Sequence, residues 1–225
     1  MRLPVRAVVS ALLLVGLMPM PLGAQSPAVE EGFTPLFDGR TLEGWQGAKD
    51  GYEVRDGAIV SLPKGSGNLC TVKQYSDFHL KFEFKLTPGA NNGIGIRVPT
   101  EEPGKRLDPA YAGMEIQVLD DSSPRYKDIK PWQHHGSIYG VVPAKTGFLK
   151  PVGEWNHEEI IARGKRITVI LNGETIVDAD IEQASTPQTI DGRDHPGLKR
   201  DSGHICFCGH GAEVWFRNLR IRELR

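Results

Sequence analysis

The chain has no excess of charge of either sign, since 27 Lys and Arg residues stand against 28 Asp and Glu residues. A protein without a broad positive field does not gather nucleic acid or anionic lipid, so neither is expected as a partner. Long apolar runs are absent as well. The run at 7–18 is about 12 residues long, short of the roughly 20 that span a bilayer. The sequence therefore predicts no membrane span.

The run at 7–18 does have the surroundings of a secretory signal. Arg2 and Arg6 precede it, and Ala24 follows as a small residue suited to cleavage. We therefore predict a signal peptide at 1–24 and an exported mature domain, either periplasmic or secreted. An amphipathic anchor that stays attached is the alternative.

Cysteine is scarce, with Cys70, Cys206 and Cys208 as the three in the chain. The paired C-x-x-C spacing of zinc sites is missing. Cys206 and Cys208 share one face of a strand-like stretch, so their parallel side chains are poorly placed to bond each other. We expect buried free thiols. A disulfide from Cys70 to one of the other two is the alternative.

Several catalytic motifs are also missing. The chain has no H-E-x-x-H metal motif, no G-x-S-x-G nucleophile motif and no phosphate-binding loop. Gly93-Ile94-Gly95 lacks the third glycine of a dinucleotide site, so its glycines are expected to allow close strand packing instead. A serine hydrolase and a nucleotide enzyme are therefore disfavoured.

Alternation of apolar and polar residues predicts many short strands with one buried face each. It is plainest at 78–86 and returns at 94–97 and at 114–118. Asp56-Gly57 and Asn172-Gly173 predict hairpins with type I′ turns, which need positive φ at both central residues. A change of phase around Arg217-Asn218 predicts a bulge in the last strand.

The chain shows no internal repeat and no helical periodicity of useful length after the leader, while Gly and Pro are plentiful. We therefore predict that residues 25–225 form one all-β domain, an antiparallel β-sandwich or jelly roll. The stretches 98–112, 120–135 and 182–203 are predicted loops. In such folds, loops of this kind rim a curved sheet face that binds ligands.

Polar residues on the predicted strand faces are the first candidates for a site. If Ile116 and its apolar neighbours face the core, Arg97, Glu115 and Gln117 face outward, and Asp120 lies where that strand opens into a loop. A solvated face with an Arg97–Glu115 ion pair is the alternative.

Histidines add a second set of candidates. His134-His135 precedes a strand that carries Tyr139, and His210 closes another strand. Histidine suits proton transfer near neutral pH. Four tryptophans could stack on sugar faces, although a core or rim position is commoner for any single one: Trp45, Trp132, Trp155 and Trp215.

Six short blocks stand in a fixed order along the chain: Leu-Phe-Asp-Gly at 36–39 with Leu-Glu-Gly-Trp at 42–45, Asn-Gly-Ile-Gly-Ile-Arg at 92–97, Gly-Met-Glu-Ile-Gln-Val-Leu-Asp at 113–120, Gly-Glu-Trp-Asn at 153–156, Leu-Asn-Gly at 171–173, and His210-Gly211 leading to Phe-Arg-Asn at 216–218. Together they resemble the 3-keto-disaccharide hydrolase family, long known as a domain of unknown function. The similarity runs from about Phe33 to Leu224. One departure is Cys208, where the family usually carries a polar amide.

The resemblance implies a concanavalin A-like jelly roll, export, and action on 3-keto-glycosides supplied by a partner sugar oxidoreductase. It leaves open which of His134 and His135 matters. A ketone at sugar C3 acidifies the C2 hydrogen, and the glycosidic oxygen on C1 then departs by elimination before water adds. Such chemistry needs a base, an enolate stabiliser and an acid.

These roles fall on the polar residues already singled out. The candidate catalytic residues are Glu115, His135 and His210. The candidate substrate-binding residues are Arg97, Gln117, Asp120 and Tyr139. The sequence assigns no cofactor, and a divalent cation held by Glu115, Asp120 and a histidine is chemically compatible with the scheme. Because the same fold serves lectins, a non-catalytic carbohydrate-binding module is the alternative function.

Overall fold

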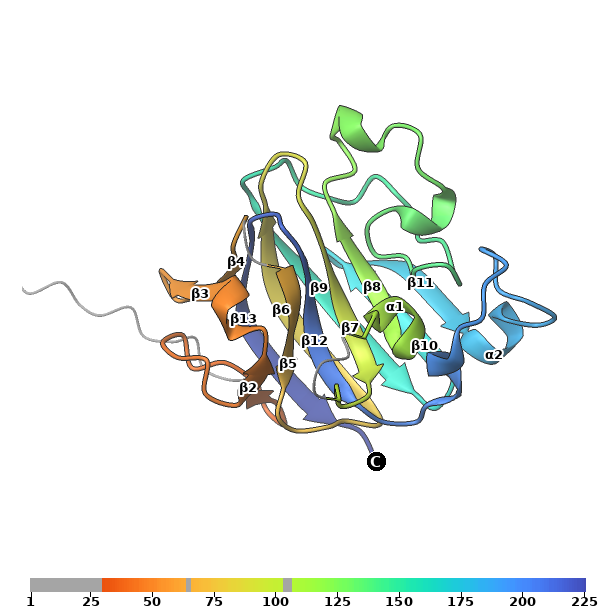
Figure 1. Ribbon diagram of the computed structural model, residues 1–225, viewed down its shortest axis with the longest axis horizontal. Helices are drawn as coiled ribbons and strands as arrows, with labels where there is room; N and C mark the ends of the chain where they lie inside the picture. Colours follow the sequence, from red (N-terminus) through yellow and green to blue (C-terminus); the bar gives the residue numbers. More distant parts are fainter. Residues whose placement is uncertain (1–29, 64–65, 103–106) are drawn as a thin grey trace, which may run out of the picture.

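The computed structural model describes residues 30–63, 66–102 and 107–225, so the predicted signal peptide lies outside the described residues. Within them, two antiparallel sheets face each other (Figure 1). The predicted antiparallel β-sandwich is confirmed. No helix in the described part of the chain is long and apolar enough to cross a membrane.

The larger sheet has seven strands in a row, and a short eighth strand, β1 (Thr34–Pro35), pairs with one of the seven, β13 (Val214–Glu223). In spatial order the seven are β11 (Glu174–Asp180), β10 (Arg166–Leu171), β9 (Trp155–Arg163), β6 (Phe78–Leu86), β13, β4 (Ala58–Ser61) and β3 (Tyr52–Arg55).

The smaller sheet has five strands. In spatial order they are β2 (Trp45–Gly47), β5 (Ser66–Thr71), β12 (His204–His210), β7 (Asn91–Val98) and β8 (Met114–Leu119). The helices are short and lie in the connections: η1 (Lys49–Gly51), α1 (Pro109–Ala112), η2 (Pro124–Tyr126), η3 (Pro131–Gln133), α2 (Ile181–Ala184) and η4 (Pro196–Lys199).

The core lies between the two sheets, where their apolar faces meet. Along β6 the burial alternates strictly, so Phe82 and its apolar neighbours are buried while the residues between them are only partly covered. Phe207 of the smaller sheet stacks on Phe216 of the larger one, with ring centroids 4.1 Å apart. On β8 every residue is buried, including the polar ones, because loops cover the outer face of this strand.

The predicted turns and the predicted bulge are confirmed. Asp56 and Asn172 have positive φ angles of 49° and 52°, and each is followed by a glycine that also has positive φ. β13 changes register against β6 between Arg217 and Arg220, and Asn218 there has a φ of 52°.

The prediction of three free thiols is wrong. Cys70 and Cys206 form a disulfide. The reason is the register of β5 against β12, which sets these two residues directly opposite each other. The alternative pairing from Cys70 is thus confirmed, and Cys208 is buried outside the disulfide.

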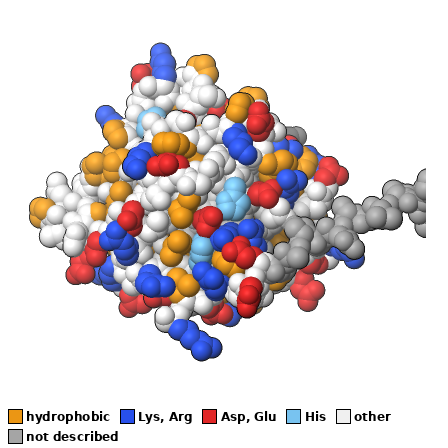
Figure 2. Space-filling model, turned by 180° about the vertical axis from the view of Figure 1, so that it is seen from behind, with side chains coloured by type: hydrophobic (Ala, Val, Ile, Leu, Met, Phe, Trp, Pro, Cys, Tyr) orange, Lys and Arg blue, Asp and Glu red, His pale blue; other side chains and the backbone are white. Residues whose placement is uncertain are grey.

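The outer face of the larger sheet carries Lys, Arg, Asp and Glu side chains intermixed, with histidines among them (Figure 2). Arg217 pairs with Glu83 at 2.7 Å. The guanidinium of Arg217 also lies 3.8 Å from the ring centroid of Trp155, and the ammonium of Lys85 lies 4.2 Å from that of Trp215. This face therefore presents no field of one sign.

Replacing Phe82 tests the core. Phe82 is fully buried and contacts the rings of Phe84 and Phe216. Phe82→Ala is expected to lower the free energy of unfolding by about 3–5 kcal/mol, the usual cost of removing a buried aromatic ring. Denaturant unfolding measures this, with the exposed Val72→Ala as control, expected within about 0.5 kcal/mol of the wild type. A loss under about 1 kcal/mol for Phe82→Ala would contradict the register of β6.

Candidate active site

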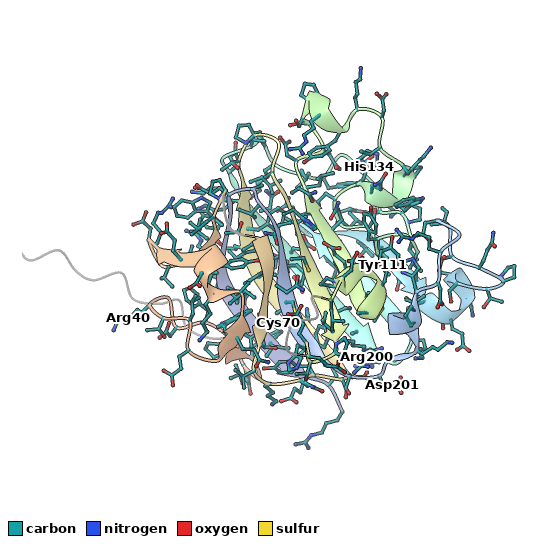
Figure 3. The ribbon with its side chains drawn as sticks, in the orientation of Figure 1. Arg40, Cys70, Tyr111, His134, Arg200 and Asp201 are labelled. Carbon is teal, nitrogen blue, oxygen red and sulfur yellow. A yellow bond between two sulfur atoms is a disulfide. The ribbon has the colours of Figure 1, made fainter. Side chains whose placement is uncertain are left out.

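A pocket of about 230 Å³ opens on the face of the smaller sheet that points away from the core. Its base is β8, and each of the three predicted rim loops supplies part of its wall. Tyr111 comes from 98–112, Tyr126 from 120–135 and Arg193 from 182–203. Figure 3 labels Tyr111 on α1, in front of β7 and β8. The three loops predicted to rim a sheet face therefore do line one pocket on it.

Glu115 lies inside this pocket, with a side chain only 6% exposed. β8 pairs with β7 so that Glu115 is opposite Gly95 and its side chain leans over Gly93. A Cβ atom at Gly93 would lie 1.8 Å from Glu115 Oε1. Gly93 is therefore required to leave room for the carboxylate. The sequence predicted close packing of strands at this glycine, whereas the structure shows close approach of a side chain.

Burial raises the pKa of Glu115 above its usual range, and His210 only partly offsets this effect. His210 Nε2 lies 3.6 Å from Glu115 Oε1, too far for a hydrogen bond but close enough for attraction between charges. The His210 side chain is 44% exposed at the end of β12. The pair joins a desolvated carboxylate to a histidine that reaches solvent.

Gln117 and Tyr139 also line the pocket. The segment after η3 runs beside β8, since Gln117 N donates to Ser137 O and Tyr139 N donates to Glu115 O. Tyr139 accepts a hydrogen bond from Gln133 Nε2 at 3.1 Å, which leaves its own hydroxyl proton for a ligand. Glu115, His210, Gln117 and Tyr139 are therefore brought together.

Tyr111 and Arg193 were not among the sequence candidates. Arg193 Nη1 donates to the Tyr111 hydroxyl, and the guanidinium lies 4.1 Å from the ring centroid. Behind them, His195 Nε2 pairs with Asp191 Oδ2 at 3.0 Å, and both side chains are almost fully buried. Burial alone would raise the pKa of Asp191, but hydrogen bonds from Arg193 N, His195 and Thr189 outweigh it and lower the pKa. The one signal for Tyr111 and Arg193 in the sequence is that each lies in a predicted rim loop.

Arg97 does not reach the pocket. It has a positive φ of 53°, at a point where β7 changes register against β12, and this turns its side chain away from Glu115. The buried guanidinium donates to Arg200 O at 3.3 Å and pairs with Asp77 at 3.3 Å. In Figure 3 Arg200 lies at the lower edge of the sandwich, below Tyr111. Arg97 is therefore neither at the predicted substrate site nor in the alternative ion pair with Glu115.

Asp120 does not reach the pocket either. Its carboxylate accepts hydrogen bonds from Gly89 N at 2.8 Å and from Ser122 Oγ at 2.6 Å, so it holds the turn after β8. It borders a different cavity, next to His134. The expected cation ligands, Glu115 and Asp120 with a histidine, are therefore not assembled. No group of three or more His, Cys, Asp or Glu side chains in 30–63, 66–102 and 107–225 could hold a metal ion.

His135 points the opposite way from the pocket. Its side chain is 1% exposed inside the core, with Nε2 3.1 Å from Glu158 Oε2. Nδ1 accepts a hydrogen bond from Leu119 N, and the ring lies 4.9 Å from that of Phe84. Gln133, at the end of η3, lines the pocket, whereas His135 faces the core. His135, which was predicted to be catalytic, therefore anchors the segment after η3 to the core.

The four tryptophans are not among the described residues that line the pocket. Trp45 is in the core and stacks on Phe207, and Trp132 packs edge-on against Tyr139. Trp155 and Trp215 lie on the larger sheet, beneath the cations described above.

Comparison with known proteins identifies the family of this chain. The family model described as the 3-keto-alpha-glucoside-1,2-lyase-like domain matches residues 32–222. The chain belongs to this family. The resemblance drawn from the six sequence blocks is thereby confirmed.

Three relatives illustrate the similarity. A 3-keto-disaccharide hydrolase of Bacteroides thetaiotaomicron is 29% identical, covering 89% of this chain and 81% of that protein. The crystal structure of a candidate glycosyl hydrolase of Parabacteroides distasonis is 30% identical, with a TM-score of 0.73 over 85% of this chain and 99% of the other. A Bacillus subtilis protein of unknown function with a galectin-like fold has a TM-score of 0.55 at 14% identity, over 85% of this chain and 94% of the other, and shows the fold alone.

The raised pKa of Glu115 predicts a dependence of stability on pH. Ionising this carboxylate costs more in the folded than in the unfolded protein, so wild-type stability falls as pH rises from about 4.3, the ordinary value, through the raised pKa. Glu115→Gln stays neutral throughout. Its stability relative to the wild type is therefore expected to increase with pH over this window.

Denaturant unfolding at several pH values between about 4 and 8 measures this difference. Glu43→Gln removes a carboxylate that is exposed and outside the pocket, and serves as the matched control. A difference between Glu115→Gln and the wild type that is the same at acidic and neutral pH would contradict the desolvated state of Glu115.

Proposed function

We propose that the protein is a hydrolase that cleaves 3-keto-glycosides. Family membership and the relative in Bacteroides thetaiotaomicron support this class of reaction. The observation that carries the proposal is the buried Glu115 carboxylate beside His210 in the pocket. A carboxylate with a raised pKa is a better general base near neutral pH than an ordinary one.

The proposed reaction begins with the ketone at C3, which acidifies the hydrogen on C2. Glu115 removes that proton, and the electron pair of the C2–H bond moves toward the carbonyl as an enolate. The enolate then expels the glycosidic oxygen from C1, which leaves a C1–C2 double bond conjugated with the ketone. Water adds at C1 and a proton returns to C2, so the net change is hydrolysis of the glycosidic bond.

Three neighbouring groups supply the remaining needs. His210, protonated, gives a proton to the leaving oxygen, and its exposure lets it exchange protons with solvent. Tyr139 has a hydroxyl proton to donate to the enolate oxygen. Arg193 adds positive charge at the rim. Donors placed where negative charge develops are commonly the largest single contribution to such catalysis.

A non-catalytic binding module is not favoured by this pocket. Carbohydrate-binding sites often rely on aromatic stacking, and the wall does carry Tyr111, Tyr126 and Tyr139, but stacking on a sugar does not need the buried Glu115 carboxylate. A binding module also gains nothing from a carboxylate that is costly to desolvate.

The substrate also implies a preceding step. Ordinary glycosides carry a hydroxyl at C3, so we propose that an oxidoreductase acting on the C3 hydroxyl supplies the ketone. The oxidised glycoside, rather than its parent, is then the substrate.

Replacing Glu115 tests the mechanism. Glu115→Gln keeps the size of the side chain but cannot take up the C2 proton, so cleavage of a 3-keto-glucoside is expected to fall by about 100-fold or more. The rate is measured on purified protein with a 3-keto-glucoside and its unoxidised parent, and the wild type is expected to cleave only the ketone.

Glu43→Gln is the control and is expected to retain the wild-type rate, because Glu43 is exposed and outside the pocket. A near wild-type rate for Glu115→Gln would remove Glu115 from the mechanism. Sugar binding without cleavage by the wild type would instead favour the binding module.

We also propose that the protein is exported. The signal peptide predicted at 1–24 supports this, and so does the Cys70–Cys206 disulfide, because disulfides persist mainly in oxidising compartments. Export is proposed to the periplasm or beyond the cell.

Mass spectrometry of the native protein tests export. The mature chain is expected to begin at Gln25 and, after denaturation without reductant, to take up one alkyl group, on Cys208. Treatment with reductant first should raise this to all three cysteines as the control. An intact leader, or three alkyl groups without reductant, would contradict the proposal.

A further inference from the structure

The residues that line the pocket extend along β8 from Glu115 to Leu119, and the two ends of this row differ. Glu115, Gln117 and Leu119 share the outer face of β8, while Met114, Ile116 and Val118 belong to the core between the sheets. Strand residues advance by about 3.3 Å each, so Glu115 and Leu119 are roughly 13 Å apart along the strand. This length accommodates a sugar ring over Glu115 and a second group beyond it.

The end at Glu115 is charged, since His210, Arg193 and Asp108 line it too. The end at Leu119 is mainly apolar, with Tyr126 and Ile129 beside it. Leu119 is 1% exposed although it lies outside the main core cluster. Its burial comes from the loop that follows β8, which folds back over the outer face of the sheet.

This apolar wall is held in place by hydrogen bonds. The Tyr126 hydroxyl donates to Gly89 O at 3.1 Å, and Asp120 accepts from Gly89 N, so both ends of the fold-back are tied to the turn before β7. Ile129 N donates to Tyr126 O at 3.4 Å. A wall formed in advance binds its ligand without a large ordering cost.

The Tyr126 hydroxyl at this end is used in the bond to Gly89, but one polar atom of Asn91 has no partner among the described residues. Asn91 lines the pocket opposite Leu119 in the register of β7 and β8. Its Oδ1 atom is buried and accepts no hydrogen bond from any residue that the structure describes. It is therefore placed to receive one donor from a bound molecule.

We propose that the end formed by Leu119, Tyr126 and Ile129 is the site for the leaving group, and that this group is an aryl ring with at most one or two polar substituents. The preferred substrates are then aryl 3-keto-glucosides rather than 3-keto-disaccharides, an inference that rests on the proposed function. A sugar in this position would bury several hydroxyls, and the one unpaired amide oxygen of Asn91 cannot satisfy them. An aryl ring buries apolar surface against Tyr126 and Ile129, which are partly exposed over the buried Leu119, and places one hydroxyl near Asn91.

The test compares two substrates that share the 3-keto-glucosyl unit and anomeric configuration. One carries phenol as the leaving group and the other carries glucose. Phenol leaves more easily than glucose in any case. The informative quantity is therefore the kcat/KM for the phenyl substrate divided by the kcat/KM for the glucosyl substrate, compared between variants.

Ile129→Asn is expected to lower that ratio by about tenfold, since loss of an apolar pocket contact changes discrimination by about 10- to 200-fold. Ile129→Thr, a smaller change, should lower it in the same direction and serves if the first variant unfolds. Val72→Asn makes the matched change at a residue that is 58% exposed and outside the pocket, and should leave both rates as in the wild type.

A ratio that stays within twofold of the wild-type value in folded Ile129 variants would overturn the leaving-group site and leave the proposed function intact. Cleavage of neither substrate by the wild type would overturn both. A lowered ratio with the Val72 control unchanged supports the site.

Discussion

The packing of one face of β8 against the larger sheet is the constraint on which the site depends. Met114, Ile116 and Val118 fill the core, and side chains alternate along a strand, so Glu115, Gln117 and Leu119 must face outward together. A slip of one residue would exchange the two faces and bury both carboxylate and amide in the core. The apolar residues therefore position the polar ones without touching a ligand.

The fold accepts a cost at this position. A carboxylate removed from water is destabilising unless it is well paired, and His210 lies beyond hydrogen-bond distance of Glu115. Gly93 gives the side chain its space at the expense of a side chain of its own in the middle of β7. The extensive core between the sheets compensates for such local losses. Stability given up at one site in exchange for chemistry is a common arrangement in enzymes.

Two buried histidine–carboxylate pairs stand behind the pocket rather than in it. His135 with Glu158 fixes the segment that carries Gln133 and Tyr139, and His195 with Asp191 supports the loop that carries Arg193. A Cβ at Gly140 would lie 2.4 Å from Asp191 Oδ2, which shows how closely this loop packs on the segment. The first pair joins its segment to β9, whereas the second lies within one loop, where His195 Nδ1 also lies 3.1 Å from Ala110 O of the 98–112 loop. Their role is to hold the residues that line the pocket.

Local pattern was enough for the class of fold and for part of the site. Alternation identified the two-faced strands, Asp56-Gly57 and Asn172-Gly173 identified hairpins, and the position of Glu115 between apolar residues placed it on the outer face. These features depend on residues next to one another in the chain, so the sequence by itself determined them. Tertiary structure decided the rest: Cys70 opposite Cys206, Arg97 turned away by a positive φ, and Tyr111 beside Arg193 from a loop 82 residues away. Such contacts depend on strand register and loop packing, which no local periodicity encodes.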